Sequence, residues 1–535
     1  MTSTRAASAP SPAWWAATIA LCAILVAPLL IVDVPPLLDY PNHLARAYVL
    51  ASLPGDPVLA QFYAPHWSVI PNLALDLIAP PLIQILPVHL VGRLMIAAAL
   101  LVPTIGAIAY NTALGGRWWG LGAGLVAFNS CLLYGFLNFE ISLGLALLLA
   151  AAWLRWREDH PTRTLVLAMA GASLLFACHL MGLVFFGLLI VGAELFHIGP
   201  AVLVLAKRPP SPAMTGKLMA APPTRPESSA AALFRRGVFL ALVFAAPAIL
   251  YVASTLRQLG GDAEFLPISA KLVQLLTAFA NYDRRLDMAT ALVAIILPAL
   301  CLLLRLGRVP GAAAVPMVLL LIAFLAAPFA WKGTQSLDTR FAIMLAFMLF
   351  AGFVPVRWPP AFRVTAIAVL TLLFTARMAL LTAAWAAHRT DLSDLRTVLL
   401  PVQPGQAVYV AEAGPHEAPA YWAANPNWRL LSNGVRTDEH LGALALIEHR
   451  AYWPFQFDNV SQQPMETREP YRTLAERVGG LPDRDEAAVA NVCGFDYVLL
   501  TGADAVPKLP PSRFRLLTQS GYAALYAVTK CKEDP

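Results

Sequence analysis

Four residues in one short stretch, Asp33, Asp39, His43 and Arg46, are of types that could carry out chemistry. They directly follow the first long apolar run, where a membrane helix would end. A carboxylate at a membrane surface can accept a proton from a nucleophile. An arginine can hold a phosphate through two parallel hydrogen bonds. These residue types therefore allow acid–base chemistry and the binding of an anion at the edge of a membrane.

The local pattern predicts how this stretch is built. Its prolines would end the apolar helix and bend the chain. From Asn42 to Leu53 the apolar residues recur at helical spacing, and Asn42 would cap that helix. We expect a short helix on the membrane surface, with Asp39 held at its start. We assign the role of base to Asp39, although it could instead merely cap the helix together with Asn42.

Polar residues at the ends of other apolar runs extend the candidate site. Glu140 closes a tight turn and could be a second acid, a metal ligand or a helix cap. Basic residues in these loops could bind an anionic group such as a phosphate. Arg340, Lys332 and Arg46 are the candidates, and each could instead contact lipid headgroups. Asp338 could orient Arg340 as an ion pair.

The remaining candidates are assigned to substrate binding. His43 and His179 could bind phosphate or a metal, or could be structural, and Tyr40 stands next to Asp39. The catalytic candidates are thus Asp39 and Glu140. No metal ligands are predicted, because the cysteines show no metal-ligand spacing. Participation of a divalent metal ion stays open. The complete set for substrate binding is Tyr40, His43, Arg46, His179, Lys332, Asp338 and Arg340.

Composition decides what kind of protein must position these residues. Hydrophobic residues make up 58% of the chain and charged residues only 13%, with a mean hydropathy of +0.63. A soluble domain carries about 25% charged residues. The chain is therefore a polytopic membrane protein. Its net charge of +6 is better explained by basic cytoplasmic loops than by nucleic-acid binding.

The apolar runs predict about eleven spans. The run from 164 to 197 is too long for one span, and we divide it at His179. The basic, proline-rich stretch 198–236 is predicted to be a flexible linker. The spans are placed at 14–32, 82–110, 118–134, 141–153, two within 164–197, 237–254, one ending at Arg305, 311–330, one ending at Arg357, and one from 363 to about 385.

The distribution of Lys and Arg places the N-terminus in the cytoplasm and the C-terminal part outside. We divide the chain into a membrane domain, 1–387, and a periplasmic α/β domain, 388–535. The membrane domain contains the outer loop 33–82 and the linker 198–236 on the cytoplasmic side. In the outer domain we expect strands at 406–411 and 495–500, a hairpin over 515–528 and a helix over 470–478. Cys493 and Cys531 could form a disulfide there or stay free.

In this layout the chain resembles the GT-C class of glycosyltransferases, which includes protein mannosyltransferases and lipid A aminoarabinose transferases. The matching pieces are Asp39–His43, Gly135–Glu140, His179–Gly182 and Asp338–Arg340. Many members have two adjacent acids in the first outer loop, whereas here Tyr40 follows the acid. The resemblance implies an all-α polytopic membrane domain with a C-terminal extracytoplasmic α/β domain. It also implies a sugar donor carried on a polyprenyl phosphate.

The resulting hypothesis is an inverting glycosyltransferase in the inner membrane of a bacterium. It would use the lipid-linked donor, contact membrane lipids and serve an extracytoplasmic acceptor such as a glycolipid, a polysaccharide or a protein. A transporter or flippase of a lipid-linked sugar is the first alternative, and it would show several charges within its spans or broken helices in matching halves. Only Arg93, Glu194 and Arg377 fall within spans. The second alternative is a non-catalytic membrane assembly factor.

Overall fold

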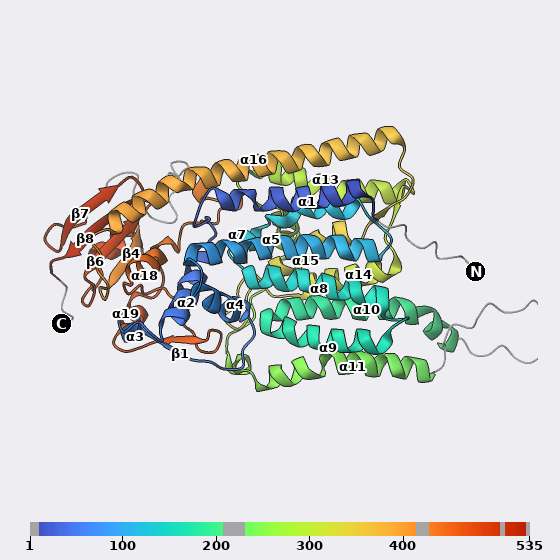
Figure 1. The fold of residues 1–535 in the computed structure, drawn as a ribbon, viewed down its shortest axis with the longest axis horizontal. Helices are drawn as coiled ribbons and strands as arrows, with labels where there is room; N and C mark the ends of the chain where they lie inside the picture. The colour runs from blue at the N-terminus through green and yellow to red at the C-terminus, as the bar shows by residue number, and fades with distance from the viewer. Residues whose placement is uncertain (1–9, 207–229, 414–426, 503–508, 531–535) are drawn as a thin grey trace, which may run out of the picture.

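Long helices packed side by side form most of the molecule, and a small sheet closes one end of the bundle (Figure 1). We call this end the outer end. The computed structural model describes residues 10–206, 230–413, 427–502 and 509–530. Within these ranges eight helices are long and apolar enough to cross a membrane. They are α1 (Pro12–Val26) with its continuation η1 (Ala27–Leu30), α5 (Val88–Ala113), α8 (Leu137–Trp156), α9 (Pro161–Cys178), α10 (Leu180–Ala206), α11 (Ala230–Ala253), α13 (Arg284–Leu303) and α16 (Pro360–Leu399).

The other three predicted spans are shorter apolar segments. Two are the single helices α14 (Gly311–Ala326) and α15 (Leu337–Ala351), and the third consists of the pieces η2 (Trp119–Ala123), α6 (Gly124–Ala127) and α7 (Ser130–Leu133). The predicted span over 118–134 is therefore present as an apolar helical segment, but it is built from three short pieces. Glycines here let another helix approach, since a Cβ atom on Gly122 would lie 2.5 Å from the ring of Phe350. Asn129 then starts α7, because its side chain accepts a hydrogen bond from the amide of Leu132.

The predicted division at His179 is confirmed. His179 has an extended backbone between α9 and α10. Its Nδ1 atom accepts a hydrogen bond from the amide of Met181, 3.1 Å away, at the start of α10. The first and last residues of the predicted linker 198–236 are helical, because α10 extends to Ala206 and α11 begins at Ala230. Residues 207–229 of that linker lie outside the described residues.

The first outer loop contains α2 (Tyr40–Ser52), a short helix as predicted, but Asn42 is not its cap. The fully buried side chain of Asn42 instead bonds the C-terminal part of the chain. Its Nδ2 donates to the carbonyl of Phe455 (2.7 Å), and its Oδ1 accepts from the amide of Phe457 (2.9 Å). Asp39 occupies the cap position without making a side-chain capping hydrogen bond. The C-terminal part therefore covers α2.

The predicted strands are present in a four-stranded sheet with the order β4-β6-β8-β7. β4 and β6 are parallel, and β7 and β8 form the predicted hairpin. Every residue of β4 is buried, so this strand belongs to the core of the domain. Helix α19 (Tyr471–Val478) matches the predicted helix. The strand bounds are β4 (Val408–Glu412), β6 (Tyr497–Thr501), β7 (Phe514–Ser520) and β8 (Ala523–Val528).

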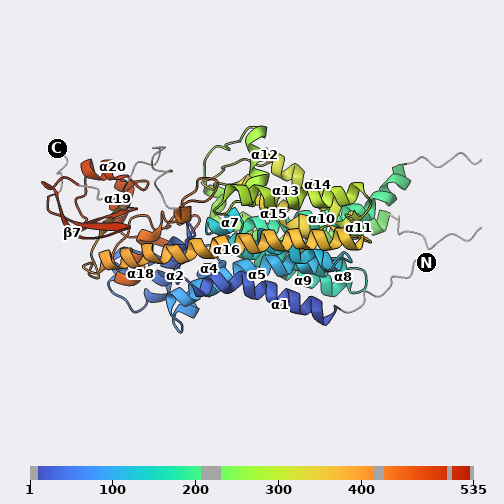
Figure 2. The ribbon, with the colours of Figure 1, turned by 90° about the horizontal axis from the view of Figure 1, so that it is seen from above.

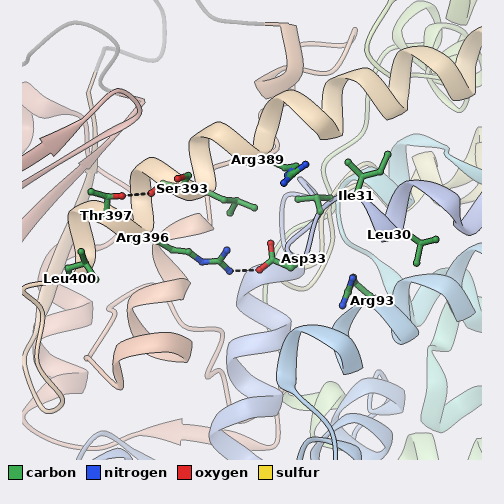
Figure 3. Close-up of a pocket in the computed structure, with 11 residues that line it drawn as sticks. Leu30, Ile31, Asp33, Arg93, Arg389, Ser393, Arg396, Thr397 and Leu400 are labelled. Carbon is green, nitrogen blue, oxygen red and sulfur yellow. Dashed lines mark hydrogen bonds and ion pairs between the residues drawn. The ribbon is translucent and has the colours of Figure 1, made fainter.

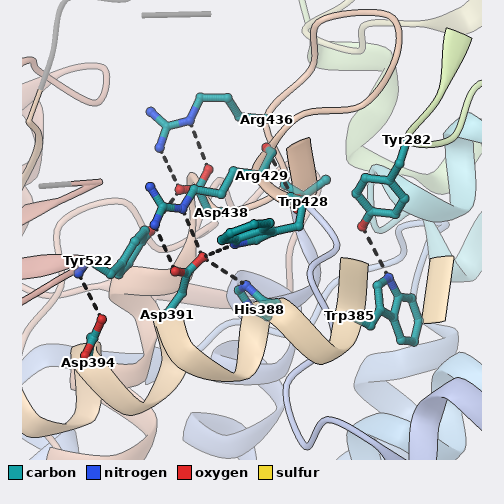
Figure 4. Close-up of polar contacts among 11 residues, drawn as sticks. Tyr282, Trp385, His388, Asp391, Asp394, Trp428, Arg429, Arg436, Asp438 and Tyr522 are labelled. Atoms are coloured by element: carbon teal, nitrogen blue, oxygen red, sulfur yellow. Dashed lines mark hydrogen bonds and ion pairs between the residues drawn. The ribbon is translucent and has the colours of Figure 1, made fainter. Parts of the chain in front are cut away.

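Helix α16 ties the sheet to the bundle. It runs without a break through residue 388, and both views show it extending from the bundle to the sheet (Figures 1 and 2). Near its outer end, Asp391 accepts hydrogen bonds from both Nε and Nη2 of Arg429, each 2.9 Å long. Arg436 bonds Asp438 in the same bidentate way, and Tyr522 donates to Asp438 (Figure 4). We call these five residues the outer-domain network.

A second connection joins the C-terminal part to the first outer loop. The short strand β1 (Tyr63–Pro65) pairs antiparallel with β5 (Met465–Thr467). Helix α18 (Leu444–His449) packs against α2, and both lie at the outer end in the turned view (Figure 2). The loop that carries Asp39 is therefore held between the bundle and the C-terminal part.

Candidate active site

The backbone around Asp39 is fixed by the turn that follows α7. The amide of Asp39 donates to the carbonyl of Tyr134, and the amide of Leu38 donates to that of Leu133, each at 3.0 Å. Gly135 makes this approach possible. It has φ +85°, and a Cβ atom there would lie 2.6 Å from the amide nitrogen of Tyr40. The stretch that begins at Asp39 and the turn that begins at Gly135, which the sequence analysis singled out separately, are therefore in contact.

The carboxylate of Asp39 faces His440, a residue of the C-terminal part. Oδ1 of Asp39 lies 3.2 Å from Nδ1 of His440, and each side chain is 17% exposed. This contact lacks hydrogen-bond geometry. The His440 ring packs edge-on against Phe457 and Trp453, which hold it in place. Sequence reasoning missed His440, because no local pattern relates it to so distant a loop.

His43 lies one turn into α2, and its side chain is partly buried. Its ring contacts Phe457 edge-on at 5.5 Å, and its Nδ1 atom has no hydrogen-bond partner. Burial, with smaller effects from the charges of Arg46 and His440, holds the pKa of His43 well below its usual range. The imidazole is therefore neutral near pH 7 and supplies no positive charge.

Arg46 is committed to a buried ion pair with Asp76. Its Nε lies 2.6 Å from Oδ1 and its Nη2 lies 3.0 Å from Oδ2, and both side chains are fully buried. This pair joins α2 to α4 (Ala74–Ile83). Asn138, at the start of α8, also binds this region, because its Oδ1 accepts from the amide of Leu75. These contacts indicate a structural role for Arg46 in joining α2 to α4.

Arg340, Glu140 and Asp338 form a second group of charged residues near Asp39. Arg340 interacts electrostatically with Asp39, and its guanidinium lies 4.8 Å from the centre of the Phe136 ring. All three side chains lie within electrostatic range of the buried thiol of Cys131. We call Cys131, Glu140, Asp338 and Arg340 the Arg340 cluster. It brings together the starts of α8 and α15 with the loop before α2.

Several polar atoms of this cluster make no hydrogen bond although they are buried. Glu140 and Asp338 are 0% exposed and Arg340 is 6% exposed. Both carboxylate oxygens of Glu140, Oδ2 of Asp338 and Nε of Arg340 make no hydrogen bond, although Asn129 lies near Glu140. Buried polar groups normally have partners. The cluster therefore keeps hydrogen-bonding capacity that a polar or ionic ligand could use.

The other candidates lie around these groups at different positions. His179 is within electrostatic range of Arg340 and contacts the Phe139 ring at 5.7 Å. The hydroxyl of Tyr40 has no partner and packs against Gly92. Lys332 places its ammonium 5.3 Å from the centre of the Trp331 ring. Within the described residues, it forms no ion pair with another candidate.

The described part of the chain contains no group of three or more His, Cys, Asp or Glu side chains that could hold a metal ion. Cys493 is disulfide-bonded, whereas Cys531 lies outside the described residues. The cysteines in the apolar runs are free, as predicted: Cys22, Cys131, Cys178 and Cys301.

No protein-family model and no curated protein sequence matches the chain. Among solved structures, it is similar to ArnT from Cupriavidus metallidurans in the apo state. The alignment covers 96% of this chain and 98% of that chain, with a TM-score of 0.51 and 10% sequence identity. At this identity the likeness concerns the fold. It confirms the predicted fold, a polytopic helical membrane domain followed by a C-terminal domain that contains strands.

Proposed function

We propose that this chain is a membrane glycosyltransferase of the GT-C type. It moves a sugar from a polyprenyl-phosphate carrier to an extracytoplasmic acceptor. The observation that supports this most directly is the position of Asp39. The carboxylate lies within electrostatic range of Arg340, beside a cluster of buried charged atoms that have no partners. The shared fold with ArnT supports the same class of activity.

In this proposal Asp39 accepts the proton of the acceptor hydroxyl while the oxygen attacks the anomeric carbon of the sugar. The bond between that carbon and the phosphate oxygen breaks on the opposite face, so the configuration inverts. The lipid phosphate leaves with the bonding electrons, and Arg340 stabilises its negative charge. His440 keeps the carboxylate of Asp39 in position.

Glu140 is the second acid of the proposed site, because its carboxyl group is fully buried beside Asn129 and belongs to the Arg340 cluster. We place the outer end of the bundle in the periplasm and the N-terminus in the cytoplasm. The disulfide at Cys493 favours an oxidising compartment for the C-terminal part. The acceptor is a glycolipid, a polysaccharide or a protein.

The test compares wild type, Asp39→Asn and Asp262→Asn for sugar transfer from radiolabelled polyprenyl-phosphate sugars, in membranes that lack the native protein. Asp262 is an exposed acid in another loop and serves as the matched control. We expect Asp39→Asn to lose transfer by about 100-fold or more, with unchanged thermal unfolding. Asp262→Asn should keep full activity.

Two outcomes would contradict the proposal. Full transfer by Asp39→Asn would remove the base from Asp39 and make Glu140 the next candidate. If no donor supports transfer even by wild type, the transporter and assembly-factor hypotheses take its place.

A further inference from the structure

A cavity of about 600 Å³ lies between the end of η1, α5 and the outer half of α16 (Figure 3). Three arginines line it, Arg93, Arg389 and Arg396, together with one acid, Asp33. The apolar rim includes Leu30, which is 82% exposed. A basic cavity with an apolar rim, located where span one ends, is suited to an anionic amphiphile.

The acids near this cavity are already neutralised by one arginine. Nη2 of Arg396 lies 2.5 Å from Oδ2 of Asp33 and 2.7 Å from Oε1 of Glu448. His89 also contacts Glu448, 2.8 Å away. Arg396 is therefore held by Asp33 and Glu448, and neither acid bonds the other two arginines in the described structure.

Arg93 and Arg389 keep capacity for an anion. Arg93 uses Nη1 to donate to the carbonyl of Leu29, and its buried Nε has no partner. Arg389 is exposed and forms no hydrogen bond or ion pair with any residue that the structure describes. Both point toward the cavity in Figure 3. An arginine fork matches two oxygens of a phosphate.

A second, apolar groove of about 450 Å³ lies between α1 and α5. Its lining includes Ile19 and Val26 from α1 and Leu101 and Ile105 from α5. Leu101 lies eight residues beyond Arg93 on α5, which is about 12 Å along a helix. The groove therefore lies on the membrane side of the arginine cavity, where an acyl chain attached to a bound headgroup would extend.

We propose that this cavity binds an anionic phospholipid of the surrounding bilayer. Its phosphate lies between Arg93 and Arg389, and one acyl chain follows the α1–α5 groove. Asp39 does not line the cavity, and the hydroxyl of the buried Tyr40 packs on Gly92, next to Arg93 in the chain. The proposal does not depend on the transferase activity.

Native mass spectrometry of the full-length protein in detergent provides the test. Lipid-stripped protein is titrated with dioleoyl phosphatidylglycerol or with zwitterionic dioleoyl phosphatidylcholine. The variants are Arg389→Gln, Arg93→Gln and, as a matched control, Arg363→Gln. Arg363 is an exposed arginine near the other end of α16. Thermal unfolding is measured for each variant.

We expect wild type and Arg363→Gln to bind phosphatidylglycerol about tenfold more tightly than phosphatidylcholine. Loss of one charged hydrogen-bond partner should weaken binding of the anionic lipid by about tenfold, so Arg389→Gln should lose most of this preference. Arg389→Lys should recover part of it. Equal binding of both lipids by wild type, or unchanged affinity in Arg389→Gln and Arg93→Gln, would overturn the proposal. Displacement of the lipid by an equal concentration of inorganic phosphate would also overturn it, because the site would then recognise a free anion.

Discussion

Two buried groups of polar and charged residues lie at the outer end of the bundle, and they differ in how completely their side chains are paired. In the outer-domain network, Arg429 is paired with Asp391 and Arg436 with Asp438, each through two hydrogen bonds (Figure 4). In the Arg340 cluster, atoms of Glu140, Asp338 and Arg340 lack partners.

This difference separates structural charges from charges kept for a ligand. Leaving a buried donor or acceptor without a partner costs about 1–3 kcal/mol per group. The outer-domain network lowers that cost, because Nη1 of Arg436, the guanidinium nitrogen not used in its pair with Asp438, forms an ion pair with Glu412. The network also joins α16 to the C-terminal part. In the Arg340 cluster, buried polar atoms without hydrogen bonds lie beside the proposed base. Such destabilising groups are expected where a site must bind a polar ligand. Mutations in the two groups should therefore affect different properties.

The largest effect should come from breaking the outer-domain network. Asp391→Ala would leave the buried guanidinium of Arg429 without its carboxylate, which should destabilise the protein by about 3–5 kcal/mol. Chemical unfolding of the purified protein in detergent measures this. The double variant with Asp391→Ala and Arg429→Leu should recover most of the lost stability. A stable Asp391→Ala variant would show that the network does not hold the outer domain.

The next effect should appear in activity and not in stability. Arg340→Gln removes the charge proposed to stabilise the leaving phosphate, so transfer should fall by about 100- to 1,000-fold. Its thermal unfolding should match that of the Arg363→Gln control or improve, because an incompletely paired buried charge is removed. A loss of stability as large as that of Asp391→Ala would make Arg340 a structural residue like those of the network.

A smaller effect is expected at the contact between the two parts of the site. His440→Gln should reduce transfer by about tenfold, because one polar contact that positions Asp39 is weakened. The variant should unfold like wild type, since His440 forms no hydrogen bond through Nδ1. Radiolabelled transfer at saturating donor gives the change in rate. An unchanged rate would exclude His440 from positioning Asp39.

The smallest effect concerns pH. Burial alone would raise the pKa of Asp438, but Arg436, Arg429 and the Tyr522 hydroxyl together hold it below its usual value. A lowered pKa in the folded state means that this stabilisation is present above about pH 4, the unfolded value, and is lost as the pH falls through the folded pKa. Asp438→Asn should therefore lose less stability than wild type between about pH 6 and about pH 3.

Unfolding midpoints of wild type and Asp438→Asn at both pH values test this, and the difference should be about 1 kcal/mol per pKa unit of displacement. Equal acid sensitivity of the two proteins would show that Asp438 does not contribute to it.

Local patterns in the sequence were sufficient for the element order. The apolar runs, the division at His179, helix α2 and the hairpin were all predicted, because periodicity, turn residues and span length are properties of short segments. Nothing within the segment 118–134 predicted that this span would be built from three short pieces, or that Gly122 would lie against Phe350 of a distant helix. The cap assigned to Asn42 was wrong for a similar reason, because Phe455 and Phe457 provide its partners.

In the candidate site, too, local sequence predicted some features and missed those that depend on distant segments. By itself the sequence determined that acids, arginines and histidines stand where apolar runs end, and which of them could serve a transfer at a membrane surface. Only the tertiary structure decided that Asp76 pairs with Arg46, that His440 faces Asp39, and that the Arg340 cluster keeps unpaired atoms. These pairings join segments far apart in the chain. They depend on how helices and the outer domain pack, and that packing leaves no pattern within a single segment.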